Sequence, residues 1–498
     1  MQVLLKPFPY RYMEYEKKLM MRELKTFFPS AEACFQNGML VLENIKKHEI
    51  KKIKWLTFVG EYMANGKWYK TFQNNIEEEA EHHGDRRQHT RYSTHGVHEY
   101  KGKYNPQIVH FMVNLLGITK QSKVLDPFNG SGTTTLECAH LGIRAVGTDI
   151  NPLACFIANS KLKTFSVDVE TARDTVSKFI NTFKSSIASH PFCNDERLEY
   201  LRKWIPEETL NVLESIRFFA LNQAPELSCL ILTVASDLIR EYSYQEPQDL
   251  RIRRRKTPLP TRPFLEAFST KVTTILQKIQ AARQTIGRNF SYKNYALCCD
   301  IKRDQPFKKN KFDAVITSPP YATALPYIDT QRISLVWLGL CEVDQIRKLE
   351  SSLIGSRETN GGEKDLLKKG FKDNDADLPR ELYSLVCDME ESVSETDGFR
   401  KRAVPYLFYR YLSDMKSVFV NIAKMTKDNA PFALIVGHNR TTLGGKTFNI
   451  DTPNLLSCLA SGCGWRHEET IILETYKRYG LNQKNAIGNE SMVILRKA

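Results

Sequence analysis

The stretch from Val124 to Asn151, VLDPFNGSGTTTLECAHLGIRAVGTDIN, constrains the fold more than any other part of the chain. An apolar run ends just before Gly130 and Gly132, a segment with helical spacing follows, and a second apolar run ends at Asp149. Glycines at such a turn let the backbone approach a ligand closely. Asp149 lies about twenty residues beyond the turn, where a strand-end carboxylate can accept both hydroxyls of a ribose. The pattern predicts a strand, turn, helix and strand that bind a nucleoside-bearing cofactor.

The residues around this glycine turn favour one kind of cofactor. The last glycine of a dinucleotide fingerprint is missing, because Thr135 occupies the third position. Asp126 stands at the entrance of the turn, where a carboxylate would repel a pyrophosphate but suit a cation. S-adenosylmethionine has no phosphate and carries a sulfonium and an ammonium group. The turn therefore favours S-adenosylmethionine over NAD or ATP.

A second motif lies in residues 311–327, KFDAVITSPPYATALPY, where an apolar run leads directly into Ser318-Pro319-Pro320-Tyr321. Two successive prolines cannot extend a central strand, so the chain must leave the sheet at its carboxyl edge, where open α/β sheets bind ligands. Together the two motifs resemble the amino-group (N4-cytosine or N6-adenine) DNA methyltransferases. That family has a cofactor turn of the form DPFxGxGTT and a catalytic loop of the form (D/N/S)PPY.

The resemblance implies a fold and a mechanism. The fold is α/β, a Rossmann-like class I methyltransferase with a mostly parallel, doubly wound sheet. A strand is expected at 431–437, and the pair 465–476 and 491–496 resembles the antiparallel hairpin in which the family's sheet ends. An exocyclic base amine is a poor nucleophile, so the enzyme must hold it in line with the methyl group and accept its protons. At matching positions, Ser318 is the side-chain acceptor, Pro319 the backbone-carbonyl acceptor ahead of Pro320, and Tyr321 the platform that stacks on a base rotated out of the duplex.

Further site residues come from the same resemblance. A segment before the first core strand closes over the cofactor in the family, and Lys103, Asn105 and Pro106 match it loosely. The candidates there are Asn105 and Phe111, although a core helix explains the apolar positions equally well. An acidic residue at another strand end, here Asp300, contacts the cofactor's adenine. Asp329 and Arg332 could orient the loop or form a plain ion pair. The expected cofactor-binding set is Asp126, Pro127, Phe128, Gly130, Gly132, Thr133, Thr134, Asp149, Ile150, Asp300 and Asn105.

The identity of Ser318 favours one target amine. Family members with Ser at this position mostly act on the N4 amine of cytosine, and those with Asp mostly act on the N6 amine of adenine. We therefore expect cytosine N4. Methylation at carbon 5 of cytosine needs a nucleophilic thiolate, and the chain has no Pro-Cys loop. An RNA guanine-amine methyltransferase of the transfer-RNA type and a non-catalytic nucleic-acid-binding module remain alternatives.

The chain of 498 residues is long enough for several units. More than a hundred residues with helical spacing interrupt the sheet pattern after the second core strand, which predicts an insertion that could recognise DNA. Its helices are expected at 167–188, 207–220, 227–242 and 264–286. The expected units are an N-terminal basic α+β unit (1–90), a first segment of the methyltransferase core (91–165), an inserted helical domain (166–290), a second core segment (291–345), a polar mobile segment (346–400) and a third core segment (401–498). In the N-terminal unit a helix is expected at 15–28 and strands at 39–42 and 55–62.

Charge and composition favour a nucleic-acid partner. The net charge of +14 suits a polyanion such as double-stranded DNA. A run inside the insertion is the expected phosphate-contacting loop, although a solvated basic face explains it almost equally well. Its residues are Arg251, Arg253, Arg254, Arg255 and Lys256.

Other features argue against several classes of protein. No apolar run is long enough to span a membrane and no secretory signal is evident, so we expect a cytoplasmic protein. Paired restriction or defence-system proteins are candidate partners. Eleven cysteines without a C-x-x-C pair indicate reduced thiols and no metal site. The adjacent His82 and His83 indicate only a linker.

Overall fold

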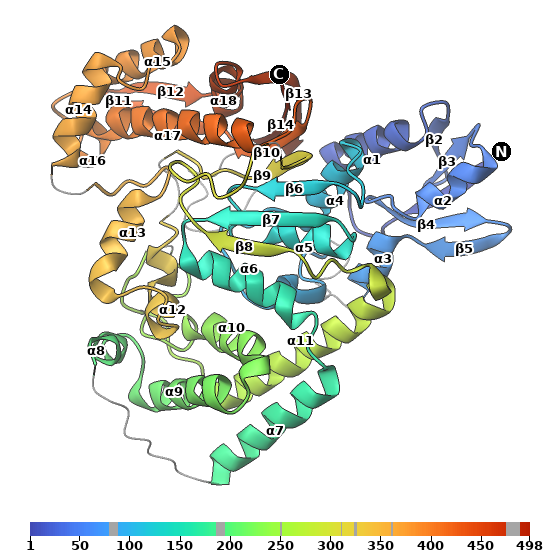
Figure 1. The fold of residues 1–498 in the computed structure, drawn as a ribbon, viewed down its shortest axis with the longest axis horizontal. Coiled ribbons are helices and arrows are strands. Elements are labelled where there is room, and N and C mark those ends of the chain that lie inside the picture. Colours follow the sequence, from blue (N-terminus) through green and yellow to red (C-terminus); the bar gives the residue numbers. More distant parts are fainter. Residues whose placement is uncertain are drawn as a thin grey trace.

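The computed structural model describes residues 1–78, 88–185, 195–249, 251–309, 311–322, 326–359, 362–474 and 489–498. Its centre is a seven-stranded sheet in the order β13-β14-β10-β9-β6-β7-β8 (Figure 1). The strands are β6 (Lys123–Asp126), β7 (Arg144–Asp149), β8 (Tyr295–Cys298), β9 (Ala314–Thr317), β10 (Pro431–Gly437), β13 (Trp465–Glu474) and β14 (Asn489–Lys497).

All neighbouring strands from β10 to β8 pair in parallel, and β14 runs antiparallel to both β10 and β13. The prediction of a mostly parallel sheet ending in an antiparallel hairpin is confirmed. Strand order reverses between β6 and β9, which pair with each other. In open α/β sheets this switch point is where ligands bind. The cofactor turn follows β6 and the predicted catalytic loop follows β9, so the two motifs start from neighbouring strands.

The two faces of the sheet are buried in two separate cores, because successive side chains of a strand point to opposite faces. One face carries Val124, Ala145, Ala314, Ile316 and Ala433. The other face carries Leu125, Val315, Phe432, Leu434 and Val436. This alternation within runs that are apolar throughout shows a doubly wound sheet covered on both sides.

The first face packs against three sets of helices. They are α4 (Pro106–Leu115), α5 (Thr133–His140) and α6 (Pro152–Thr164) of the core, then α7 (Val169–Ser185), α8 (Glu196–Arg202), α9 (Glu207–Asn222), α10 (Ser228–Ile239) and α11 (Phe264–Ile286), and finally α12 (Arg332–Trp337). Helical segments were predicted at 167–188, 207–220, 227–242 and 264–286, and they correspond to α7, α9, α10 and α11. The short helix α8 was not predicted. The core of this helical insertion is continuous with the core beneath the sheet, so its standing as a separate domain stays a prediction.

The second face packs against α14 (Glu363–Asp373), α15 (Arg380–Glu391), α17 (Val404–Met425) and α18 (Thr452–Ser461), which lie above the sheet in Figure 1. The hairpin of β11 (Asn439–Leu443) and β12 (Lys446–Ile450) precedes α18. Two short helices, α13 (Ile346–Ser352) and α16 (Phe399–Arg402), complete the segment predicted to be polar and mobile. That segment is therefore helical over much of its length, while its mobility stays a prediction.

The N-terminal unit is a five-stranded antiparallel sheet in the order β2-β3-β1-β4-β5 with helices α1 (Glu14–Phe27), α2 (Ile50–Ile53) and α3 (Phe72–Glu77). Its strands are β1 (Val3–Pro7), β2 (Glu32–Gln36), β3 (Met39–Glu43), β4 (Val59–Ala64) and β5 (Lys67–Lys70). The predicted strand at 55–62 overlaps β4 only in part, and β1, β2 and β5 were not predicted. Among the described residues, no single helix is long and apolar enough to cross a membrane, and only the bent pair α9 and 225–239 passes by length and composition.

Candidate active site

The cofactor turn between β6 and α5 depends on glycine at two positions. Gly130 and Gly132 have φ angles of +48° and +85°, in the left-handed region that favours glycine. A Cβ atom on Gly132 would lie 2.8 Å from the Cβ of Ala158 in α6. A Cβ atom on Gly130 would lie 3.4 Å from the ring of Tyr100, so the turn and this ring form a close cradle. The geometry fits a site where a ligand approaches the backbone.

Asp126 ties the cofactor turn to the strand that leads to the catalytic loop. Its Oδ1 accepts hydrogen bonds from the Thr317 hydroxyl at 2.6 Å and from the backbone N–H of Phe128 at 3.0 Å. Burial raises the pKa of Asp126 to about 6, although these hydrogen bonds and one to Thr134 act to lower it. Its Oδ2 is buried and has no partner among the described residues. This orphaned acceptor fits a site that receives a cationic cofactor.

Asp149 ends β7 beside the turn, as predicted. Its Oδ2 accepts a hydrogen bond from the backbone N–H of Gly130 at 2.8 Å, and its Oδ1 accepts one from Asn151 at 2.8 Å. Burial raises the pKa of this carboxyl to about 6, against the lowering effect of these N–H groups. Each oxygen has a further lone pair, and the side chain is not fully buried, so the carboxylate can still accept hydroxyl groups.

Several other predicted cofactor residues are already engaged within the protein. The hydroxyl of Thr134, which is buried like Thr133, bonds to the hydroxyl of Tyr104. Asn105 caps α4 by accepting a hydrogen bond from Gln107 N–H at 2.9 Å. Its other end donates to Gln88, so this side chain acts as a helix cap. Pro127, Phe128 and Ile150 lie in the turn and at the end of β7, as expected.

Asp300 lies two residues beyond the end of β8 and forms part of a local turn. Its Oδ1 accepts a hydrogen bond from Lys302 N–H at 3.1 Å, and its own N–H donates to Asp304 at 2.9 Å. Phe111, the other weak candidate, is fully buried and contacts the Phe58 ring in the core. Neither observation shows a cofactor contact, so both assignments stay predictions.

The predicted catalytic tetrapeptide begins where β9 ends. No hydrogen bond joins the Ser318 hydroxyl to any residue within the described ranges, and this side chain is partly exposed. The Tyr321 hydroxyl donates to Glu490 in β14 at 2.6 Å, and burial raises the pKa of Tyr321 well above its ordinary value. The tetrapeptide therefore presents one free hydroxyl and one anchored ring beside the cofactor turn.

A buried lysine that supports the glycine turn was not predicted from the sequence. Lys161 of α6 is fully buried, and its Nζ donates to the carbonyl and hydroxyl oxygens of Ser131 at 2.9 and 3.0 Å. Burial lowers the pKa of Lys161 well below its ordinary value. A lysine usually lies at the surface, so nothing in the sequence marks this one as a support for the glycine turn.

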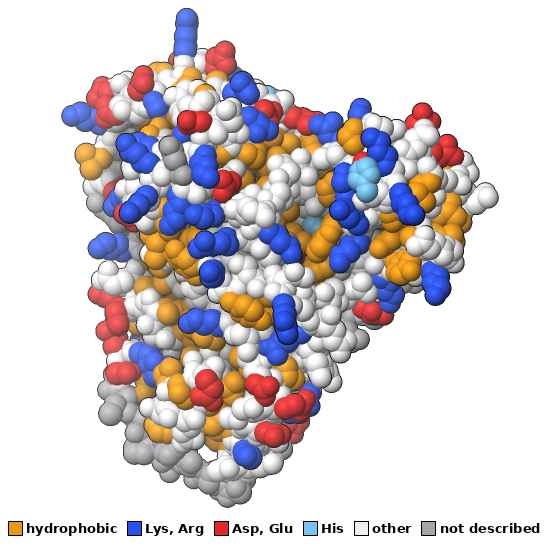
Figure 2. All heavy atoms as spheres, turned by 45° about the vertical axis from the view of Figure 1, so that its right-hand side comes forward, with side chains coloured by type: hydrophobic (Ala, Val, Ile, Leu, Met, Phe, Trp, Pro, Cys, Tyr) orange, Lys and Arg blue, Asp and Glu red, His pale blue; other side chains and the backbone are white. Residues whose placement is uncertain are grey.

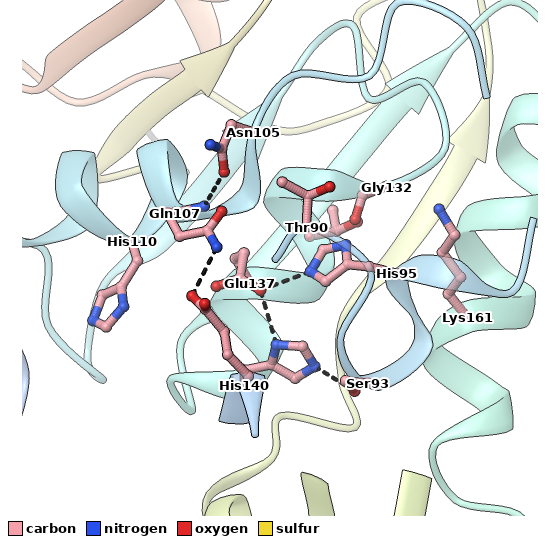
Figure 3. A network of polar contacts seen from close by, with 12 residues as sticks. Thr90, Ser93, His95, Asn105, Gln107, His110, Gly132, Glu137, His140 and Lys161 are labelled. Atoms are coloured by element: carbon pink, nitrogen blue, oxygen red, sulfur yellow. Dashed lines mark hydrogen bonds and ion pairs between the residues drawn. The ribbon is translucent and has the colours of Figure 1, made fainter. Parts of the chain in front are cut away.

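A buried network joins the cofactor helix α5 to the segment that precedes α4 (Figure 3). Glu137 Oε1 accepts hydrogen bonds from His95 Nε2 at 2.7 Å and from His140 Nδ1 at 2.9 Å. His140 Nε2 lies 3.0 Å from the Ser93 hydroxyl. Burial opposes ionisation of Glu137, yet the hydrogen bonds from His140 and His95 outweigh it and hold the pKa of the carboxyl below its usual range.

The same three residues are the one group of His, Cys, Asp or Glu side chains in the described ranges whose ligand atoms cluster closely enough for a metal ion. Both Glu137 to histidine distances are those of ordinary hydrogen bonds, and the two ring N–H groups satisfy one carboxylate oxygen. We interpret the group as a structural link. His82 and His83 lie outside the described residues.

The predicted phosphate-contacting run is partly structural. The Arg254 guanidinium lies 4.7 Å from the centre of the Trp204 ring, and Arg255 donates to the carbonyl of Ser243 at 2.8 Å. Arg253 forms an exposed ion pair at 3.2 Å with Asp249. The run therefore differs from a uniformly solvated basic face. Among the described residues, no side-chain hydrogen bond, ion pair or ring contact is formed by two of its members, Arg251 and Lys256.

The sheet order, the glycine turn with Asp149 and the proline-rich loop at the switch point define a methyltransferase-like α/β enzyme. A family model described as "DNA methylase" matches residues 11–160. Type II methyltransferase M.BsoBI of Geobacillus stearothermophilus is 24% identical over 442 residues, covering 82% of this chain and 84% of that protein. A tRNA (guanine(10)-N2)-dimethyltransferase of Methanothermobacter thermautotrophicus is 40% identical over 52 residues, 10% of this chain and 16% of that protein.

Among solved structures, TrmN from Thermus thermophilus aligns over 100% of this chain and 99% of its own with 10% identity and a TM-score of 0.34, too low to establish a common fold. The family match and the relatives agree with the motifs. Together they support the N6/N4 amino-methyltransferase family, with S-adenosylmethionine as the cofactor.

Proposed function

We propose that this protein methylates the exocyclic N4 amine of cytosine in double-stranded DNA, as a Type II methyltransferase. The observation that carries the proposal is the Ser318 hydroxyl, which has no hydrogen-bond partner among the described residues and lies at the end of β9, next to the strand that enters the cofactor turn. A partly buried hydroxyl that is left unbonded is available to a substrate.

The residues of the turn would hold the cofactor. Asp149 would accept the ribose hydroxyls, and the backbone at Gly130 and Gly132 allows close approach. The buried Oδ2 of Asp126 offers a negative charge to a cationic centre. When bound, S-adenosylmethionine supplies an electrophilic methyl group attached to a sulfonium.

The catalytic tetrapeptide would act on the target amine. Ser318 Oγ and the carbonyl of Pro319 accept hydrogen bonds from the two amine protons, which holds the nitrogen lone pair toward the methyl group. The Tyr321 ring, held through its hydroxyl by Glu490, would stack on the flipped base. No covalent intermediate with the enzyme is required.

The choice of cytosine N4 as the target amine is inferred from the serine at position 318. Adenine N6 is the alternative within the same fold. A guanine amine in transfer RNA is a second alternative, favoured by the short match to the tRNA dimethyltransferase. A restriction or defence-system partner would accompany a Type II enzyme, and this too belongs to the proposal.

The test is mass spectrometry of nucleosides from unmodified DNA and from RNA, each incubated with the protein and isotopically labelled S-adenosylmethionine. Labelled N4-methylcytosine in DNA is the expected product. Labelled N6-methyladenine would overturn the inference from Ser318 and keep the mechanism. Label in RNA alone would replace DNA by transfer RNA as the substrate, and no label in either would overturn the proposed activity.

A further inference from the structure

The chain leaves β10 at the same edge of the sheet as the catalytic tetrapeptide. The strands β9 and β10 pair in parallel, with Thr317 opposite Leu434, and they lie side by side in Figure 1. β10 ends at Gly437, which pairs with Glu490 of β14. The Tyr321 hydroxyl donates to the Glu490 side chain at 2.6 Å. The end of β10 is therefore held next to the tetrapeptide.

Two segments of the chain meet just beyond this strand end. His438 Nδ1 lies 3.3 Å from Asp451 Oδ1, and Asn439 of β11 pairs with Ile450 of β12. Thr452 follows as the first residue of α18. These contacts bring the start of β11 and the start of α18 together at the carboxyl edge of the sheet.

Each of these two segments carries a buried polar atom without a hydrogen-bond partner. The Nδ2 atom of Asn439 and the Oγ1 atom of Thr452 are inaccessible to solvent, and neither is bonded to any part of the described structure. The Thr452 side chain is almost completely buried, at 1% exposed. A buried donor without a partner costs folding free energy. Two such donors in one place therefore indicate a site where a bound molecule completes the hydrogen bonds.

The hydrogen-bonding edge of cytosine matches these two donors. In the proposed function, Ser318 and Pro319 accept the protons of the N4 amine, which leaves two acceptors on the same edge of the base, N3 and O2. Adenine offers one acceptor there, N1, followed by a C–H group. A flipped base is read by hydrogen bonds to this edge. An amide N–H group and a hydroxyl group can supply the two donors that cytosine requires.

We propose that Asn439 and Thr452 bind the ring edge of the target cytosine, with the amide donating to N3 and the hydroxyl donating to O2. The inference rests on the proposed function. Asn439 is assigned to N3, the acceptor next to the amine, because it follows the strand end that Glu490 links to the tetrapeptide. Figure 2 shows lysine and arginine side chains spread over the face that carries the N-terminal unit, so charge attracts DNA broadly and does not position one base.

The experiment replaces each donor by a side chain of similar size that cannot donate. The site variants are Asn439→Leu and Thr452→Val, and the controls Asn449→Leu and Thr447→Val change exposed residues of β12 in the same hairpin. Single-turnover methyl transfer is measured with the protein in excess over an unmodified mixed-sequence DNA duplex and labelled S-adenosylmethionine. Each site variant should slow transfer by about tenfold, the effect of one lost hydrogen bond, and the controls should match the unaltered protein.

Three further measurements separate a contact with the base from a structural role. Thr452→Ser keeps the hydroxyl, so it should restore transfer to within about threefold of the unaltered rate. The urea midpoint of Asn439→Leu and Thr452→Val should not fall, because no hydrogen bond within the described protein is lost. Binding of S-adenosylhomocysteine, measured by calorimetry, should not change, since both side chains contact the base and not the cofactor.

Unchanged transfer in both site variants would overturn the inference. A lower urea midpoint without rescue by Thr452→Ser would also overturn it, because the two atoms would then stabilise the fold. The nucleoside assay on the unaltered protein separates these failures from failure of the function. If N4-methylcytosine is labelled and both site variants keep the full rate, the inference is wrong and the function stands. If adenine N6 is labelled and Asn439→Leu alone slows transfer, the choice of cytosine and the role of Thr452 are wrong, and the Asn439 contact stands with adenine N1 as its acceptor.

Discussion

The cofactor turn and the catalytic tetrapeptide lie side by side at the switch point, yet they differ in how their polar groups are held. In the turn, Asp149, the Oδ1 atom of Asp126 and the Ser131 oxygens have hydrogen-bond partners within the protein, and only Oδ2 of Asp126 is left without one among the described residues. In the tetrapeptide the Ser318 hydroxyl has none among the described residues. We infer that folding preorganises the polar groups of the cofactor turn, while the serine of the tetrapeptide is left to form its hydrogen bond with the substrate. Five substitutions test that contrast.

The largest effect is expected from Gly132→Ala, which breaks the preorganised side. The substitution combines a φ angle of +85° with a Cβ placed 2.8 Å from the Ala158 Cβ and 3.0 Å from its Cα, so the backbone of α6 must move. We expect a loss of roughly 3 kcal/mol in the free energy of unfolding, measured with urea. Gly66→Ala is the control, because φ is +72° there and nothing lies within 4 Å of the new atom. An equal loss in both variants would contradict the packing argument.

Ser318→Ala and Thr317→Val contrast two neighbouring hydroxyls. Ser318→Ala should reduce the rate of methyl transfer by about 100-fold and change the unfolding free energy by less than about 0.5 kcal/mol, because no bond within the described protein is lost. Thr317→Val removes the 2.6 Å bond to Asp126, so it should cost about 1 kcal/mol of stability. Rates come from single-turnover assays with labelled cofactor. A stability loss in Ser318→Ala would show that its hydroxyl is held after all.

Glu137→Gln tests the buried link behind the turn. The neutral amide weakens two charge-assisted hydrogen bonds, so about 2 kcal/mol should be lost at pH 7, against almost nothing for the exposed Glu170→Gln. The folded-state pKa of Glu137 is lowered, so its stabilisation is present above the unfolded pKa and is lost as pH falls toward the folded value. The difference between variant and unaltered protein should therefore shrink below about pH 4. Equimolar bound metal, detected by elemental analysis, would contradict the structural interpretation.

The features that could be predicted from the sequence are those that a local pattern of residues determines. Features set by local patterns were predicted well: the strand at 431–437 agrees with β10 at both ends, and the two motifs follow neighbouring strands of the sheet. The strands β2 and β5 were missed because most of their side chains are exposed, so they lack the apolar alternation that marks a half-buried strand.

Contacts between distant segments were not predictable. The bond from His95 to Glu137 spans 42 positions of sequence, and the buried Lys161 has a residue type that is almost always at the surface. The run of basic residues likewise concealed the structural roles of Arg254 and Arg255, which contact the Trp204 ring and the Ser243 carbonyl.

The smallest effect is expected from Asp149→Asn, which alters the side of the turn that faces the cofactor. Loss of the charge should weaken S-adenosylmethionine binding by about tenfold at pH 7.5, measured by calorimetry. Asp313→Asn should change it less than about threefold, because that carboxylate lies before the start of β9 and pairs with Lys427. Burial raises the pKa of Asp149 to about 6, so affinity in the unaltered protein should fall as pH drops through 6 and stay flat in the variant.

The expected fall in S-adenosylmethionine affinity below pH 6 cannot be explained by loss of the folding stability that Asp149 contributes. A raised carboxyl pKa favours the protonated group in the folded state, so this residue contributes most stability below its unfolded pKa and loses that contribution as pH rises through about 6. Acidification from pH 7 to 5.5 therefore removes the acceptor for the ribose hydroxyls while the contribution of Asp149 to folding improves. An inflection near pH 6 that persisted in Asp149→Asn would assign the titration to another group, with Asp126 the first candidate because burial also raises its pKa to about 6.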